Sequence, residues 1–279
     1  MTVINTNVAA IAAKNALQTN NRALASAMES LATGKRINSA ADDAAGLSIA
    51  DNMTSYIRGL DQAVRNANDA IGLLSTAEGA LIEQSAMLQR MRELAVAAST
   101  DTTTATQRDY MDLEYQALEA EIDRICSQTE WNGSAILDDT GGVAADGVFV
   151  FQVGADASQT FSVSIGDMST GGDLSAIAAG DVDTQANATT AIGNLDTAIA
   201  AVATQRATIG AGINRLQHAI ENLTMISQET SASRSQVEDT DYAEATAALA
   251  RAQVIQQAGT AMLAQANQQP SSVLYLLRS

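Results

Sequence analysis

The sequence predicts a mainly α protein: a long antiparallel helical rod, packed as a coiled-coil-like bundle, with nested N- and C-terminal helices and a small β-hairpin insert. Two observations support this fold class. Apolar residues recur at heptad spacing over long stretches, which is the pattern of helices that pack along one seam. The chain also has one proline and 3% aromatic residues, a composition that suits thin, alanine-lined helix contacts better than a thick core.

The longest predicted helix covers residues 44–99, a stretch without proline. Its heptad positions are Leu60, Ala67, Leu74, Leu81, Leu88 and Ala95. This repeat places one apolar stripe along the helix, and a helix of this length needs partner helices to cover the stripe. Ser39, Asp42 and Asp43 precede it, and a serine followed three residues later by an acid is typical of a helix N-terminus.

Two more rod helices are expected. Apolar residues alternate at steps of four and three within residues 105–129, and they do so most regularly from residue 186 onward. The polar run at residues 99–104 should form a loop. The helix after this loop can therefore lie antiparallel on the long one.

The two ends of the chain are predicted to form single helices with narrow apolar seams. The first should end at Gly34, and the last should run from about residue 242 to residue 267 and stop at Pro270. We expect these helices to pair with each other. Because they bury little surface relative to the entropy of ordering them, we also expect them to be disordered in the free chain and to fold on self-assembly. The seam residues are Val8, Ile11, Leu24, Leu31, Leu249, Leu263, Leu274 and Leu277.

The middle of the chain carries a short insert. Two runs of alternating residues, 148–153 and 160–165, are joined by glycine and small polar residues, which indicates a β-hairpin. Two strands alone are marginally stable, so the hairpin should pack on the helices. The expected domains are residues 1–43 with 236–279, residues 44–137 with 185–235, and the insert at residues 138–184.

Composition argues against several classes of function. The formal net charge is -17, with two lysines, which disfavours binding to nucleic acid or to an anionic membrane. One histidine and one cysteine do not supply the spacing of a metal site or of a catalytic dyad, so we expect neither an enzyme nor a cofactor. We also expect neither a cleaved secretory signal nor a membrane span. His218 should face solvent, and Cys126 should be a small half-buried filler.

One segment of the long helix resembles a contact surface. Leu88 and Ala95 belong to the seam, which leaves Leu94 on an outer face one turn from Arg90. An apolar residue flanked by charges is typical of a contact surface, although a single exposed leucine is common on any protein.

Several stretches of the chain resemble bacterial flagellin. They are VINTN at 3–7, LATGKRINSAADDAAGL at 31–47, RNANDA at 65–70, TAEGAL at 76–81, EIDRI at 121–125, WNG at 131–133 and LAQANQQP at 263–270. Together they cover about residues 1–137 and 186–279.

The resemblance implies a structural subunit that self-assembles into the bacterial flagellar filament. The terminal helices would form the inner tube of the filament and the rod helices its surrounding layer. It also implies export through the flagellar type III apparatus, an extracellular location, and several partners. These are further copies of the chain, hook–filament junction and cap proteins, an export chaperone, and the vertebrate Toll-like receptor for flagellin. The residues that match the family's subunit and receptor contact are Gln89, Arg90, Glu93, Leu94 and Glu114.

Two other functions remain open at this point. A hook–filament junction protein would share similar terminal helices but would form only a short collar. A surface adhesin or glycan-binding protein would use the insert at residues 138–184.

Overall fold

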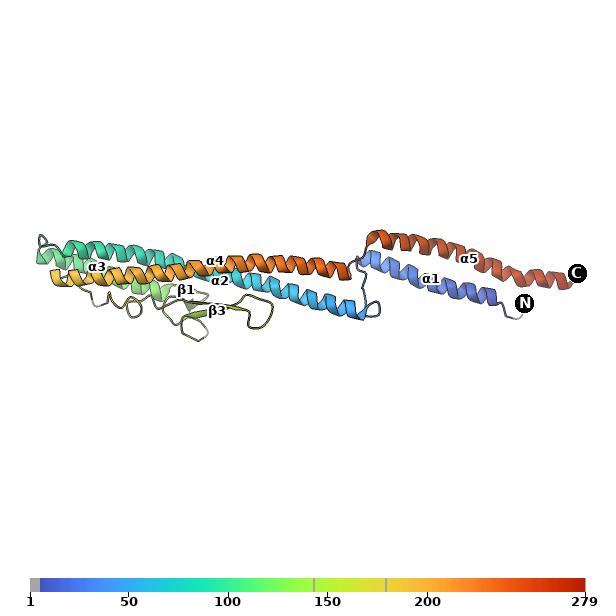
Figure 1. Cartoon of the computed structure of the whole chain (residues 1–279), viewed down its shortest axis with the longest axis horizontal. Helices are drawn as coiled ribbons and strands as arrows, with labels where there is room; N and C mark the ends of the chain where they lie inside the picture. Colours follow the sequence, from blue (N-terminus) through green and yellow to red (C-terminus); the bar gives the residue numbers. More distant parts are fainter. Residues whose placement is uncertain (1–5, 143, 179, 279) are drawn as a thin grey trace. The chain divides into compact units, whose positions relative to one another are not determined.

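The computed structural model describes residues 6–142, 144–178 and 180–278, with side chains up to residue 268. The described chain is mainly helical, which confirms the predicted fold class (Figure 1). The helices are α1 (Val8–Thr33), α2 (Ala44–Ala98), α3 (Ala105–Gln128), α4 (Gln185–Glu238) and α5 (Tyr242–Arg278). The strands are β1 (Glu130–Trp131), β2 (Ser134–Ala135), β3 (Val148–Gln152) and β4 (Thr160–Ser164).

The chain divides into two compact units. One contains Met1–Ser55 and Glu229–Ser279, and the other contains Tyr56–Gln228. The division falls within α2 and within α4, and the predicted insert at residues 138–184 lies inside the second unit.

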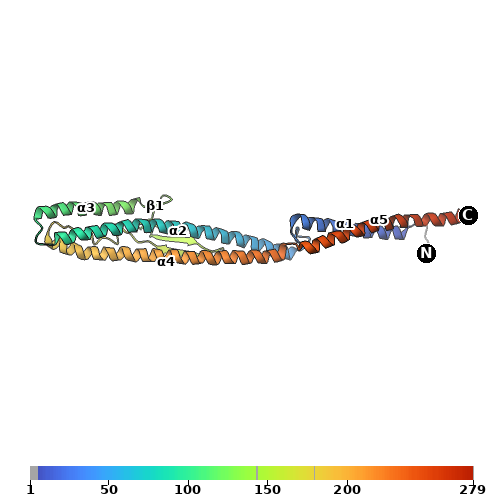
Figure 2. The same ribbon diagram turned by 90° about the horizontal axis from the view of Figure 1, so that it is seen from above.

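In the second unit, α2 runs between α3 and α4 (Figure 2). An ion pair between Arg90 and Glu114 joins α2 to α3, and an ion pair between Arg92 and Asp196 joins α2 to α4. The predicted heptad residues of α2 are all buried in this unit. The antiparallel placement of α3 on α2 is as predicted, because the chain reverses at the polar loop between them.

The start of α2 and the end of α1 follow signals in the sequence. The Asp43 carboxylate accepts hydrogen bonds from the amides of Ala45 and Gly46, so it caps the first turn of α2. Asp42 does not cap α2 but accepts hydrogen bonds from the amide and the hydroxyl of Ser39 in the preceding turn. Gly34 ends α1 in the left-handed conformation, with φ of 71°, which a residue with a side chain rarely adopts.

Helix α3 begins with a reciprocal cap between Thr104 and Gln107. The side chain of Arg108 reaches back from α3 and donates to the carbonyl of Ala98 at 2.8 Å. This bond satisfies one of the carbonyls left free at the end of α2 and closes the loop between the two helices.

Pro270 does not end the last helix, so that prediction is wrong. Helix α5 continues to Arg278. A proline in a helix leaves the carbonyl four residues earlier without its usual donor, and here that carbonyl belongs to Ala266. The side-chain amide of Asn7 donates to it at 2.7 Å, so the carbonyl is satisfied without a helix end.

The insert contains the predicted hairpin. Strands β3 and β4 pair antiparallel, with Phe149 opposite Val163. The side-chain amide of Asn66 on α2 donates to the carbonyl of Gln152, and that of Gln205 on α4 donates to the carbonyl of Ser164. The hairpin is therefore held to α2 and to α4, as its marginal stability in isolation requires.

A second, smaller hairpin was not predicted. Strands β1 and β2 pair through a two-residue turn formed by Asn132 and Gly133, whose φ angles are 51° and 78°. An Asn-Gly pair is the strongest short-range signal for such a turn, so the signal was present in the sequence. The flanking strands of two residues each are too short to show an alternating pattern.

Candidate functional surfaces

A small network of ion pairs lies on the outer surface of α2 and α3. The guanidinium of Arg90 donates from Nε to Glu114 at 2.8 Å and from Nη1 to Glu93 at 3.0 Å. The hydrogen bond to Glu114, followed by that to Glu93, holds the pKa of Arg90 above its usual value. All three side chains stay substantially exposed, and Gln89 beside them is exposed as well. The structure therefore brings together four of the five residues that the family resemblance singled out.

Leu94 is not part of this outer surface, and the expectation that it faces outward is wrong. Its side chain is 6% exposed and belongs to the main core cluster of the second unit. Because α3 and α4 flank α2, the buried face of α2 is wider than one heptad stripe. Leu94 and Ala95 are therefore both buried, although they are adjacent in the sequence.

A shallow groove next to the Arg90 network was missed in the sequence. It has a volume of about 450 Å³, and its lining residues are Gln89, Arg92, Glu93, Val96 and Ala97. The guanidinium of Arg92, one of the lining residues, donates to Asp196 of α4 at 2.7 Å, which fixes the position of this side chain. Val96, another lining residue of the groove, is an exposed apolar residue. Val96 directly follows the seam residue Ala95, and adjacent residues of a helix point in different directions, so the sequence could have indicated an apolar residue outside the seam.

In the first unit, α1 and α5 pair antiparallel through a thin seam. The side-chain amide of Asn20 donates to the carbonyl of Ala252 at 2.8 Å, and that of Gln256 donates to Asn21 at 3.2 Å. A Cβ atom at Gly259 would lie 3.1 Å from Cγ of Leu17, so the two helices approach closely there. This pairing of the two chain ends was predicted.

The terminal seam residues are only partly covered by this pairing. Leu24, Leu31, Leu249 and Leu263 are half-buried. Val8 and Ile11 are exposed, and the side chains of Leu274 and Leu277 lie outside the described residues. Further apolar side chains on the same two helices, those of Met28, Val254, Ile255 and Met262, are exposed as well. Paired α1 and α5 therefore leave a large apolar surface uncovered.

The two residues with the most reactive side-chain types are not arranged for chemistry. Cys126 is fully buried, more deeply than we expected, and its thiol donates to the carbonyl of Met168 at 2.7 Å. Burial raises the pKa of this thiol to about 12, so it stays protonated at neutral pH. His218 is exposed on α4, as predicted, and lies beside Glu221.

Within the described part of the chain, no group of three or more histidine, cysteine, aspartate or glutamate residues is placed to hold a metal ion. No helix among the described residues is long and apolar enough to cross a membrane.

Known proteins with similar sequences and structures identify the family. The model of the bacterial flagellin N-terminal helical region matches residues 4–141, and that of the C-terminal helical region matches residues 192–277. The flagellin of Halalkalibacterium halodurans is 42% identical over 276 residues, which cover 99% of this chain and 100% of that protein. The flagellin of Bacillus subtilis is 41% identical over 302 residues, 99% of each chain.

The solved structures agree with the sequence matches. The crystal structure of Bacillus cereus flagellin aligns with a TM-score of 0.50 and 37% identity, over 57% of this chain and 88% of that one. The chain therefore belongs to the bacterial flagellin family, whose members are structural subunits of the flagellar filament and not enzymes.

Proposed function

We propose that this chain builds the flagellar filament through two surfaces: the exposed apolar faces of α1 and α5, and the charged outer surface around Arg90. Membership of the flagellin family establishes a self-assembling subunit of an extracellular filament. The proposal adds which residues hold the copies together. Contacts between different patches of identical chains give an open-ended helical polymer when the rotation from one copy to the next does not close a ring.

The observation that carries the proposal is the apolar surface that remains after α1 and α5 have paired. On α5, Val254 is 65% exposed and Met262 is 64% exposed. Several large apolar side chains exposed on one pair of helices are typical of an interaction site. We infer that neighbouring copies cover it, which assigns the terminal segments 1–43 and 236–279 to the inner tube of the filament.

The remaining parts of the chain take the outer positions in this proposal. Residues 44–137 and 185–235 form the layer around the tube. The insert at residues 138–184 carries only short strands and loops, and it would leave the filament surface comparatively smooth.

A pair of substitutions at one exposed position tests the apolar contact. Val254→Asp should prevent polymerisation onto filament seeds, because a charge would have to be buried between copies. Val254→Leu keeps the position apolar and should polymerise like the original chain. Sedimentation and electron microscopy measure the yield of filaments. Normal growth of the Val254→Asp protein would contradict the proposal, as would normal growth after removal of either terminal segment.

We propose that the surface formed by Gln89, Arg90, Glu93 and Glu114 is a second contact between subunits and the contact for the vertebrate Toll-like receptor. The ion pairs of Arg90 support this role, because they hold charged side chains of α2 and α3 in one arrangement on an exposed face. Leu94, the fifth residue in the family pattern, is buried beneath this surface and would support the contact indirectly, by packing in the core under α2.

A reporter-cell assay on purified monomer tests the receptor contact. Arg90→Ala should reduce the signal, because it removes the centre of the network. Arg124→Ala is a matched control, since Arg124 forms a comparable exposed ion pair with Glu121 elsewhere on α3. Equal signals from the two variants and the original chain would refute the contact.

Export and assembly partners complete the proposal. We infer export through the flagellar type III apparatus, an export chaperone for the C-terminal segment, and contacts with hook–filament junction and cap proteins. Support comes from family membership over almost the whole chain. The same full-length similarity to flagellins favours the filament subunit over the junction protein and the adhesin.

A further inference from the structure

Helix α5 contains a proline eight residues before its end. Proline has no backbone N–H, so Pro270 cannot donate to the carbonyl of Ala266, four residues earlier. A carbonyl that loses its donor in this way commonly bonds to water, or the helix kinks or ends at the proline. In this chain it accepts a hydrogen bond from the side chain of Asn7, at 2.7 Å.

Asn7 is at the same time the N-cap of α1. Its side-chain oxygen accepts from the amide of Ala10 at 3.0 Å, while its side-chain nitrogen donates to Ala266. Each end of one carboxamide therefore serves one helix. Asparagine fits both demands, because aspartate can cap α1 but has no donor when ionised, and alanine can do neither.

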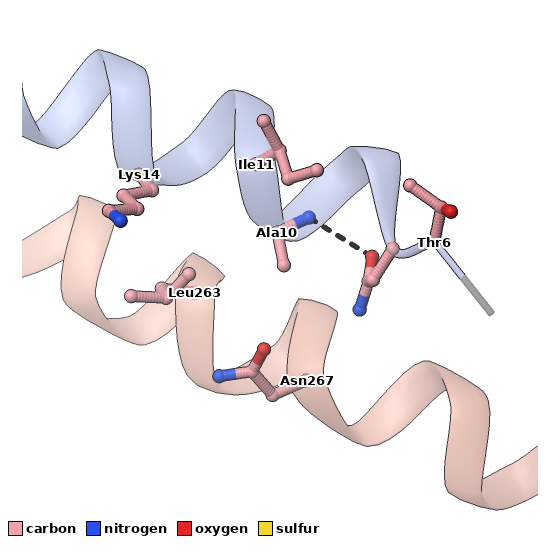
Figure 3. Close-up of a pocket in the computed structure, with 7 residues that line it drawn as sticks. Thr6, Ala10, Ile11, Lys14, Leu263 and Asn267 are labelled. Carbon is pink, nitrogen blue, oxygen red and sulfur yellow. Dashed lines mark hydrogen bonds between the residues drawn. The ribbon is translucent and has the colours of Figure 1, made fainter. Parts of the chain in front are cut away.

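The surroundings provide little other support for this junction. An open groove of about 390 Å³ lies next to it between α1 and α5 (Figure 3). Besides Asn7, its lining residues are Thr6, Ala10, Ile11, Lys14, Leu263 and Asn267. Since the side chains do not fill this space, dense packing cannot hold the two helix ends together there. The hydrogen bonds of Asn7 carry a correspondingly larger share of the contact.

We propose that Asn7 couples the two ends of the chain: the first turn of α1 and the continuation of α5 through Pro270 form together. When Asn7 is in place, the Ala266 carbonyl is satisfied and α5 stays helical to Arg278. When it is not, the carbonyl turns to water and α5 loses its last turns. The coupling joins Asn7 to Ala266, and each of these residues belongs to a stretch of sequence that carries the family resemblance.

Four proteins test this coupling as a double-mutant cycle: the original chain, Asn7→Asp, Pro270→Ala, and the double variant. Asn7→Asp keeps the cap of α1 but removes the donor to Ala266. Pro270→Ala restores a backbone N–H at residue 270, so Ala266 regains a donor within α5 and no longer needs Asn7. The readout is hydrogen exchange of the amides of residues 271–278 in filaments grown from seeds of the original protein. This test depends on the proposed function in one respect only, because the filaments that are measured must first assemble.

We expect at least tenfold faster exchange of this segment in Asn7→Asp filaments, or a loss of filament growth by that variant. The double variant should match the original chain, and so should Pro270→Ala. Thr6→Asp places the same charge one residue away and should also match the original chain, which controls for charge.

Three results would overturn the coupling. They are unchanged exchange in Asn7→Asp filaments, a double variant as defective as Asn7→Asp, or equal defects in Thr6→Asp or Pro270→Ala. A failure of the proposed apolar contact between subunits can be told apart from a failure of the coupling. It would appear as normal filament growth by the Val254→Asp protein and would not change the results of the double-mutant cycle at Asn7 and Pro270.

Discussion

Asn20 of α1 donates a hydrogen bond to the backbone carbonyl of Ala252 in α5, and both residues are buried in the seam between the two helices. A buried amide is costly unless it is paired, and it finds its partner at one relative position of the two helices. This contact therefore fixes the register of α1 against α5, which alanine-rich faces specify poorly by shape alone.

Replacing Asn20 should weaken the terminal pair. In Asn20→Asp, a carboxylate oxygen takes the place of the donor and faces the Ala252 carbonyl, which should cost about 1–3 kcal/mol per subunit. The temperature at which filaments depolymerise should fall. Asn15→Asp introduces the same charge at an exposed position of α1 and should leave this temperature unchanged. Equal effects of the two variants would show that charge, and not the hydrogen bond, matters.

The free chain should have ordered and disordered parts. The terminal helices bury few side chains, while α2, α3 and α4 share a continuous core in the second unit. We expect backbone amides of residues 1 to about 40 and 240–279 to exchange rapidly in the monomer, because their contacts do not offset the entropy of ordering. Amides in the core of the second unit should exchange slowly. Strong protection of both termini before polymerisation would contradict this expectation.

The seam of α2 should dominate the stability of the second unit. Leu88 is fully buried in the core, so Leu88→Ala should lower the free energy of unfolding by about 2–5 kcal/mol. Leu113 lies on α3 and is 65% exposed, and Leu113→Ala should change it by about 0.5 kcal/mol or less. Urea unfolding of the monomer, followed by circular dichroism, measures both. Similar losses in both variants would argue against a seam-based core.

Cys126 should make the protein sensitive to alkali. Burial raises the pKa of its thiol to about 12 in the folded chain, from an ordinary value of 9.0. The unfolded chain therefore loses this proton first, and stability falls as the pH rises above about 9. Cys126→Ala should make the fall with pH between 9 and 11 shallower by up to about 1.4 kcal/mol per pH unit.

A thiol reagent gives an independent check on Cys126. At pH 8 the folded monomer should react slowly, and unfolding in urea should release full reactivity. Reaction of the folded monomer at the rate of an exposed thiol would contradict the burial of Cys126.

Removal of the Tyr115 hydroxyl should stabilise the folded monomer. The side chain is fully buried, and its oxygen has no hydrogen-bond partner among the described residues. Burial, with the nearby charges of Glu119, Asp112 and Asp181, raises the pKa of Tyr115 to about 12. Tyr115→Phe removes an unpaired buried group, so it should raise the stability of the monomer at pH 7 by about 1 kcal/mol.

The pH dependence of Tyr115→Phe provides a second readout. The pKa of Tyr115 is raised to about 12 in the folded chain, so the hydroxyl ionises first in the unfolded chain, and the stability of the original protein falls as the pH rises from about 10 toward 12. The phenylalanine variant should lose less stability in that range. A destabilised variant at pH 7 would show that the hydroxyl is satisfied in solution.

Most helices could be predicted because their signals are local. The heptad repeat and the polar loop placed the ends of α2 and α3 within one residue of those observed. Alternation over runs of six residues was enough to predict β3 and β4, which have five residues each. A helix or a strand of this kind is recognised from its own period, without knowledge of what packs against it.

The candidate surfaces could be predicted in part. Family motifs led to the Arg90 network, whose residues the structure brings together. They did not reveal that Leu94 is buried, because that depends on two helices flanking α2. The groove beside Val96 was not predicted either, although its lining residues all lie on α2, because the faces of α2 that stay exposed depend on where the neighbouring helices pack.

The sequence by itself determined the helical rod, the hairpin and the flagellin family, because heptad spacing, strand alternation and family motifs are all carried by neighbouring residues. Only the tertiary structure decided how wide the buried face of α2 is and whether α5 ends at Pro270. The physical reason is the same in both cases: a side chain is buried, or a carbonyl is satisfied, by atoms that fold in from distant parts of the chain, α3 and α4 for Leu94 and Asn7 for Ala266.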